Sequence, residues 1–382
     1  MIINTKKAVG IVSYGARIPR LQILGSTIAE AQAKTEQKIY KALGVESKTV
    51  PGIDEDTITL STASGLQAIQ RLELHGVSCR ENIGVLFIGS ESHPYAVKPS
   101  GTIVAQALGI ASDSFTKNKP LALADLQFAC KAGTQAMQIA LFYVHSEFCQ
   151  YALATGTDTA QAKPGDVLEY TAGAGSASFI LGTEKFSSGK QANSGQKLLA
   201  RLLATTSVAT DTPDFWRRPY QAYPEHAGRF TADPGYFGHI RMAAELLLLE
   251  TGLTARDFEY CVFHTPNAKF PIQIAKELGF SNKQIEASML VTQIGNTYAG
   301  SSMLGLAATL DIAQAGKKIL VVSYGSGSGS DAFIFETTEY LEEARKKWID
   351  AVGTRSTSEF LSDQLQKLQS ISYEEYLVNS AH

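Results

Sequence analysis

Apolar positions along the chain follow two patterns. Short apolar runs, typical of buried strands, alternate with longer segments whose apolar residues recur at helical spacing. The runs predict strands at 8–13, 84–88, 121–125, 151–155, 174–181, 199–207, 260–264, 318–324 and 332–336. Helical spacing predicts helices at 136–144, 236–251, 271–278 and 302–315, with further helical patterns between the early strands. Strands that alternate with helices of this length predict a layered α/β architecture.

The order of these elements is similar in the two parts of the chain, which suggests an internal duplication. A polar stretch at 187–196, rich in Ser, Gly, Lys and Gln, is typical of a surface connection between the parts. We therefore divide the chain into an N-terminal half, 1–186, and a C-terminal half, 187–382. A segment at 211–234, rich in Pro, Arg and aromatic residues, has no clear period. Long loops of this kind are usually functional or disordered, and the aromatic residues favour an ordered wall of an active site.

Composition describes an ordinary globular protein and excludes several classes of function. Hydrophobic residues make up 44% of the 382 residues, and the net charge of −3 gives no general attraction to nucleic acid or anionic membrane. The four cysteines have neither disulfide-framework nor zinc-site spacing, so we expect no metal. Residues 1–7 are polar, and the apolar stretch at 246–249 is far too short to span a membrane. We expect a cytoplasmic protein.

Cys130 is the most informative residue. It lies where the strand predicted at 121–125 gives way to the helix predicted at 136–144, and small residues around it leave room for a substrate. The positive end of a helix dipole lowers the pKa of a thiol and so increases its nucleophilic thiolate fraction. A buried, inert side chain is nevertheless the commoner fate of a cysteine in an intracellular chain.

Other residues that suit acid–base chemistry stand at the ends of predicted elements. Glu91 follows one predicted strand, His264 ends another, and Asn296 precedes a predicted helix. The glycine-rich segment 325–329 follows a further strand, where backbone N–H groups can approach a substrate oxygen closely. Each feature alone has an ordinary explanation as a helix start, a core histidine, a turn or a strand end. Together they favour a site, because ligands gather where strands end and helices begin in α/β sheets.

Several motifs span nearly the whole chain. They are GSESHPYAVKPSGTIVAQALG from Gly89, LQFACKAGTQA from Leu126, DFWRR and YPEHAGRFT between Asp214 and Thr231, HTPNAKFP from His264, GNTYAGSS from Gly295 and SYGSGSGSD from Ser323. Together they resemble the thiolase superfamily and, within it, the archaeal-type 3-hydroxy-3-methylglutaryl-CoA (HMG-CoA) synthases. The resemblance implies a thiolase fold with five layers, αβαβα, built from two similar halves with the site between them.

The resemblance also implies an acyltransferase that condenses acetyl-CoA with acetoacetyl-CoA and water to give HMG-CoA and CoA. Cys130 would carry the acetyl group as a thioester, Glu91 would remove a methyl proton, and His264 would act as acid toward the ketone oxygen. The enolate needs hydrogen-bond donors, for which the backbone N–H groups at Cys130 and near Ser326 are candidates. A dry site would raise the pKa of Glu91, as its role as a base requires. No metal or organic cofactor is implied.

Binding positions follow from the same resemblance. Contacts to the substrate are matched by Thr171, Thr231, Asn296 and Ser326, and contacts to the phosphates of coenzyme A by Arg229 and Lys269. The chain departs from archaeal relatives at Gln273, where they carry Arg, at Thr35-Glu36, where they carry Asp-Ala, and between 109 and 121, where it is longer. These departures concern CoA affinity and the acyl carrier rather than the catalytic residues.

Other functions fit part of the pattern. A ketoacyl-ACP synthase III-like enzyme uses Cys, His and Asn on the same fold, but its decarboxylative condensation needs no base at Glu91. A biosynthetic thiolase needs a second cysteine near the C-terminal glycine segment, whereas the last cysteine here is Cys261. A carrier-protein-dependent β-branching synthase would keep the same chemistry. A silent scaffold subunit of a thiolase complex would be expected to lose Cys130, Glu91 or His264.

The resemblance finally implies partners and a pathway. Thiolase-fold proteins usually form homodimers, and archaeal-type synthases associate with acetoacetyl-CoA thiolase and a small bridging protein that contains an OB fold. The product would enter the mevalonate pathway to isoprenoids or a secondary-metabolite pathway.

Overall fold

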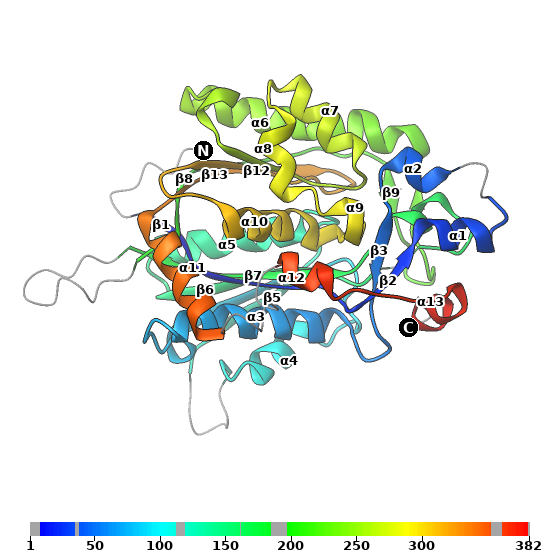
Figure 1. The fold of residues 1–382 in the computed structure, drawn as a ribbon. Coiled ribbons are helices and arrows are strands. Elements are labelled where there is room, and N and C mark those ends of the chain that lie inside the picture. The colour runs from blue at the N-terminus through cyan, green and yellow to red at the C-terminus, as the bar shows by residue number, and fades with distance from the viewer. Residues whose placement is uncertain are drawn as a thin grey trace, which may run out of the picture.

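The computed structural model describes residues 8–34, 38–111, 119–160, 162–184, 197–352 and 361–380. Within them, helices and strands form five alternating layers (Figure 1). The outer layers contain α6 (Phe237–Thr251) with α7 (Lys269–Glu277) on one side, and α3 (Thr57–Glu73) with α4 (Ser100–Ala107) on the other. The middle layer contains α5 (Ala132–His145) and α10 (Ser301–Ile312). The predicted five-layered αβαβα architecture is confirmed.

The described strands of the two strand layers hydrogen-bond in the order β11-β12-β13-β8-β1-β7-β6-β4-β5. The first half of the chain supplies β1 (Val9–Arg17), β4 (Ile83–Gly89), β5 (Ala122–Leu126), β6 (Tyr151–Asp158) and β7 (Gly175–Thr183). The second half supplies β8 (Ala200–Ala209), β11 (Tyr260–Phe263), β12 (Lys318–Val322) and β13 (Gly329–Thr337). The two sets meet where Gly10 and Ile11 of β1 pair with Arg201 and Ala200 of β8.

The two sets of strands share one pattern. In the first, β7 pairs antiparallel with β1 and β6, and β6 pairs parallel with β4. In the second, β13 pairs antiparallel with β8 and β12, and β12 pairs parallel with β11. This repetition agrees with the similar element order read from the sequence. The predicted boundary after residue 186, and the polar stretch at 187–196, lie outside the described residues.

The middle helices are buried because they are apolar on nearly every side. All residues from 301 to 310 of α10 are buried, as expected for a helix with no polar face. Met137 and Leu141 of α5 belong to the same apolar cluster as Met303 and Leu304 of α10. One core therefore joins the two halves of the chain.

A smaller unit packs beside one end of these layers (Figure 1). Its sheet contains β2 (Leu21–Leu24), β3 (Ser47–Val50) and β14 (Gln369–Ser370), and its helices are α1 (Gly25–Ala31), α2 (Ile39–Leu43) and α13 (Tyr373–Ser380). Further helices are α8 (Asn282–Ile285), α9 (Val291–Ile294), α11 (Glu339–Val352) and α12 (Leu361–Gln366). Apart from β14, the described parts of the chain that follow β13 are thus mainly helical.

The segment at 211–234 is ordered, as its aromatic residues predicted. It contains a two-stranded hairpin, β9 (Phe215–Trp216) and β10 (Glu225–His226), followed by short helical turns that lead into α6. No helix within the described ranges is long and apolar enough to cross a membrane. The same ranges hold no group of three His, Cys, Asp or Glu side chains that could bind a metal ion.

Candidate active site

Cys130 lies at a sharp turn between β5 and α5. Ala129, the residue before it, has a φ of 44°, a left-handed conformation that is strained in residues with a Cβ atom. The side chain of Cys130 is buried just ahead of the first turn of α5. Burial, followed by the neighbouring Glu91 carboxylate, raises the pKa of the Cys130 thiol well above its ordinary value. The predicted lowering of this pKa is therefore wrong, because burial and nearby negative charges outweigh the helix dipole.

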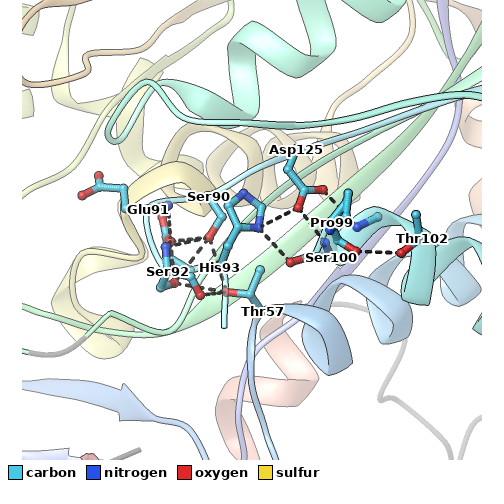
Figure 2. A network of polar contacts seen from close by, with 11 residues as sticks. Thr57, Ser90, Glu91, Ser92, His93, Pro99, Ser100, Thr102 and Asp125 are labelled. Atoms are coloured by element: carbon cyan, nitrogen blue, oxygen red, sulfur yellow. Dashed lines mark hydrogen bonds and ion pairs between the residues drawn. The ribbon is translucent and has the colours of Figure 1, made fainter. Parts of the chain in front are cut away.

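Glu91 follows β4, and its carboxylate contacts the Cys130 thiol. Burial first, and the charge of Asp158 next, raise the pKa of Glu91 to about 8, while a hydrogen bond with the Cys130 thiol acts in the opposite direction. Glu91 Oε1 is buried and has no hydrogen-bond partner among the described residues. The Glu91 carboxylate points away from the polar network of Ser90, Ser92 and His93 (Figure 2). It is therefore available to a ligand near the sulfur.

Asp158 holds the backbone of Glu91 in place, a role that was not predicted from the sequence. Its Oδ1 accepts hydrogen bonds from the Glu91 N–H at 2.7 Å and from the hydroxyls of Ser90 and Ser92, each at 2.7 Å. Its Oδ2 accepts the Ala299 N–H at 2.8 Å. Asp158 is fully buried at the carboxyl end of β6, and an acidic residue in that place is the signal that could have identified it.

His264 follows β11 and is almost fully buried. Its backbone N–H donates to the carbonyl of Val322 at 3.0 Å, and its carbonyl accepts the hydroxyl of Tyr236 at 2.6 Å. Burial lowers the pKa of the His264 imidazole to about 3, so the ring is neutral near pH 7. Its Nδ1 has no hydrogen-bond partner among the described residues. The geometry therefore presents a neutral imidazole to the site.

Asn296 follows Gly295, which has a φ of 73° and ends α9. The Asn296 N–H donates to the carbonyl of Thr171 at 2.6 Å, which ties the two halves of the chain together. Asn296 Oδ1 accepts the Tyr298 N–H at 2.9 Å. Because the amide oxygen has this donor, the amide NH₂ group is the one that remains for a ligand.

A cavity of about 230 Å³ brings most of the predicted residues together. Its wall includes Cys130, His264, Asn296, Thr171, Thr231 and Ser326. Apolar and aromatic side chains complete it, among them Leu43, Leu168, Phe215, Tyr236, Phe270, Tyr298 and Tyr324. Glu91 is not part of this wall. Its carboxylate contacts Cys130, and it lines a second cavity of about 560 Å³ with Ser92, His93 and Arg217.

Of the two predicted CoA-binding residues, only Lys269 has a described side chain, and it does not line the first cavity. Lys269 is exposed at the start of α7, between Asn267 and Phe270, both of which line the cavity. The side chain of Arg229 lies outside the described residues, as do Thr35 and Glu36. Gln273 is exposed on α7 and donates a hydrogen bond to Glu277 Oε1 at 3.0 Å.

The glycine-rich segment 325–329 is held from both sides. Asp214 accepts the Gly327 N–H at 2.7 Å and the Tyr324 hydroxyl, which fixes one face. On the other face, a Cβ atom added to Gly325 would lie 2.5 Å from the carbonyl oxygen of Phe128. This segment can therefore approach the turn that carries Cys130 only because Gly325 has no side chain.

Several curated proteins named hydroxymethylglutaryl-CoA synthase are similar to this chain over most of its length. The one from Archaeoglobus fulgidus is 49% identical over 334 residues, which cover 87% of this chain and 90% of that protein. The one from Methanopyrus kandleri is 48% identical over 339 residues, 89% of this chain and 90% of that protein. The one from Methanothermobacter thermautotrophicus is 47% identical over 336 residues, which cover 88% of this chain and 90% of that protein.

Residues 248–337 match the profile of the family described as 3-Oxoacyl-[acyl-carrier-protein (ACP)] synthase III C terminal. A solved HMG-CoA synthase complexed with CoA is 23% identical, with a TM-score of 0.79, and covers 97% of this chain and 89% of that one. MvaS in complex with 3-hydroxy-3-methylglutaryl coenzyme A is 21% identical, with a TM-score of 0.80. The match covers 99% of this chain and 93% of that one. At these identities the structural likeness shows the fold.

Proposed function

This chain belongs to the hydroxymethylglutaryl-CoA synthase family of acyltransferases, and on this premise we propose that it condenses acetyl-CoA with acetoacetyl-CoA and water to give HMG-CoA and CoA. One observation carries the proposal. Cys130, His264 and Asn296 line one cavity, and the Glu91 carboxylate contacts the Cys130 thiol. These groups lie far apart in the sequence and supply a nucleophile, a base and hydrogen-bond donors around one position.

In the first step, the Cys130 sulfur attacks the carbonyl carbon of acetyl-CoA. A new carbon–sulfur bond forms, the bond to the sulfur of CoA breaks, and the thiol proton ends on the departing CoA thiolate. The thiol is the form expected at rest, because its pKa is raised. The backbone N–H groups of Cys130 and Ser326 are the candidate donors for the oxyanion.

In the second step, Glu91 removes a proton from the methyl group of the acetyl thioester. A pKa of about 8 makes Glu91 a stronger base than an exposed carboxylate. The enolate carbon then bonds to the ketone carbon of acetoacetyl-CoA, and the ketone oxygen becomes the product hydroxyl by taking up the proton that Glu91 removed, which restores the Glu91 carboxylate. His264 is neutral, so we assign it the role of hydrogen-bond donor to the ketone oxygen, with the amide of Asn296 beside it. Water finally hydrolyses the thioester to a carboxylate and restores the Cys130 thiol.

Two measurements test this proposal. Mass spectrometry after incubation with acetyl-CoA is expected to show one added acetyl group on the Cys130 peptide of the wild-type chain, and none on the chain with Cys130→Ala. A steady-state assay with acetyl-CoA and acetoacetyl-CoA is expected to release CoA, whereas malonyl-ACP as acceptor is expected to give no condensation product. Turnover of malonyl-ACP would instead support a ketoacyl synthase. The absence of any adduct would support a scaffold subunit.

The remaining expectations also belong to the proposal. We expect CoA thioesters rather than carrier-protein thioesters as substrates, with no metal or organic cofactor. Arg229 and Lys269 are proposed to contact coenzyme A, and Thr171, Thr231 and Ser326 to contact the acyl group. A homodimer, a cytoplasmic location and association with acetoacetyl-CoA thiolase and an OB-fold bridging protein stay predictions.

A further inference from the structure

A buried ion pair lies directly beside Cys130, at the turn that precedes α5. Lys131 follows Cys130, and its Nζ lies 2.9 Å from Asp331 Oδ1 on β13. The side chains of Lys131 and Asp331 are 1% and 0% exposed. Lys131 comes from the first half of the chain and Asp331 from the second, so the pair connects the two halves where the cavity lies between them.

Hydrogen bonds satisfy both charges. Lys131 Nζ also donates to Gln135 Oε1 at 2.5 Å and lies 4.1 Å from the centre of the Phe128 ring. Asp331 accepts the Thr134 hydroxyl at 2.9 Å and the Ser207 hydroxyl at 2.5 Å. Placing two charges in a protein interior costs so much desolvation that such a pair contributes little net stability compared with apolar side chains. Stability alone therefore gives a weak reason for the pair.

The pair joins the two segments that supply the candidate oxyanion donors. On one side, Lys131 follows the strained Ala129 and Cys130, and its backbone N–H donates to the carbonyl of Phe128 at 3.2 Å. On the other side, Asp331 follows the glycine-rich segment, where a Cβ atom on Gly329 would lie 2.9 Å from Cε of Lys131. A strained backbone conformation persists only where its surroundings fix it firmly.

We propose that Lys131 and Asp331 are positioning residues that hold the N–H groups of Cys130 and Ser326 at the spacing needed to stabilise the oxyanion. This inference rests on the proposed function, since it assumes that Cys130 is acetylated. Neither side chain touches the reacting atoms in this assignment. The pair acts by fixing one backbone segment relative to the other.

The test compares two double variants. Lys131→Met with Asp331→Asn removes both charges and leaves no buried charge unpaired, whereas either single change could unfold the chain. The matched control, Arg201→Met with Glu184→Gln, removes an ion pair at 2.8 Å that also joins the two halves, near the start of β8. Thermal unfolding of both variants checks that they are folded.

Three measurements distinguish a positioning role from a defect in substrate binding or in the reactivity of the thiol. For the Lys131/Asp331 variant we expect the single-turnover rate of Cys130 acetylation to fall about tenfold to hundredfold. This is less than the roughly hundredfold to thousandfold loss on removing one oxyanion donor, because the donors are displaced and not removed. The KM for acetyl-CoA should change less than about twofold, because ground-state binding is unaffected. Alkylation of Cys130 by iodoacetamide, which needs no oxyanion donor, should match the wild-type rate.

Three results would contradict the inference. Acetylation at the rate of the control variant would overturn the inference. A parallel loss of acetylation and alkylation would also overturn it, because the pair would then act on the thiol itself. If wild-type Cys130 were not acetylated at all, the proposed function would be contradicted, and the inference with it.

Discussion

The backbone N–H of Glu91 donates a hydrogen bond to Oδ1 of Asp158 at 2.7 Å, so the candidate base is attached to a second, fully buried carboxylate. The attachment fixes where Glu91 sits, and the charge of Asp158 makes ionisation of Glu91 more costly. After burial, this charge is the next largest cause that raises the pKa of Glu91 to about 8. One residue thus controls both the position and the basicity of Glu91.

Replacing Asp158 is expected to move the pH dependence of condensation. Glu91 acts as a base only when it is ionised, so the wild-type rate should rise with pH up to about 8. Asp158→Asn removes a negative charge and should lower the pKa of Glu91, which shifts the acid limb of the profile to lower pH. The measurement is the rate of condensation from pre-formed acetyl-enzyme across pH. Glu245→Gln, an exposed change on α6, is the control, and an unshifted Asp158→Asn profile would contradict the assignment.

Replacing the base should separate the two chemical steps. Glu91→Gln is expected to accept an acetyl group on Cys130 but to form no HMG-CoA, because only enolate formation requires the carboxylate. The same change should lower the pKa of the Cys130 thiol, since the Glu91 charge raises it, and so should speed alkylation by iodoacetamide above about pH 8, where wild-type Glu91 is ionised. Mass spectrometry follows both reactions. Equal loss of acetylation and condensation would remove the role of Glu91 as the enolising base.

A side chain at Gly325 should separate the two segments that meet there. The added Cβ of Gly325→Ala would lie 2.5 Å from the Phe128 carbonyl oxygen, so the backbone must move. Overpacking of this kind typically costs about 1–3 kcal/mol, and acetylation should slow as the glycine-rich segment shifts. Gly238→Ala is the matched control, because its Cβ would meet its nearest neighbour at an ordinary 3.7 Å. Chemical denaturation and single-turnover acetylation report the two effects, and a Gly325→Ala variant that behaves like the control would show that the contact is unimportant.

Removing the charge of Lys269 should weaken CoA binding without slowing chemistry. A cation that pairs with a phosphate at an exposed site contributes about 1 kcal/mol, which corresponds to roughly a fivefold rise in the KM for acetyl-CoA. The kcat of Lys269→Ala should stay near the wild-type value. The KM values of the variant and the wild-type chain should become more similar at high salt, because salt screens the attraction between the lysine and the phosphate. Lys276→Ala, an exposed change on the same helix, should leave KM unchanged. A defect confined to kcat would contradict the binding role.

The main strands and helices were predictable because they are apolar runs of the right length. The strand predicted at 8–13 continues to Arg17, since Tyr14 and Gly15 pair with β7 although the sequence there has no apolar run. The short strands of the smaller unit were missed for a related reason. β3 is only four residues long and buries the polar side chain of Lys48, which hydrogen-bonds to the hydroxyl of Tyr376 at 3.1 Å.

Residue chemistry and family resemblance predicted the nucleophile, the histidine and the amide, which the fold gathers around one cavity. The electrostatics of the thiol could not be predicted in the same way. The helix that follows Cys130 is local in sequence, whereas Glu91 and Asp158, which raise its pKa, approach only after folding. Asp158 was missed because its partners lie on other elements, and only the assembled sheet brings them together.

The core shared by α5 and α10 has a consequence for biosynthesis of the chain. A ribosome completes Cys130 and Glu91 long before it reaches His264, so an emerging polypeptide carries the thiol without its imidazole. Because Met137 and Leu141 pack in the same cluster as Met303 and Leu304, the interior around α5 stays incomplete until the later segment has been made. The nascent thiol therefore lacks its full catalytic surroundings until the later segment is complete, and activity is expected to arise only once α10 has packed against α5 between the strand layers.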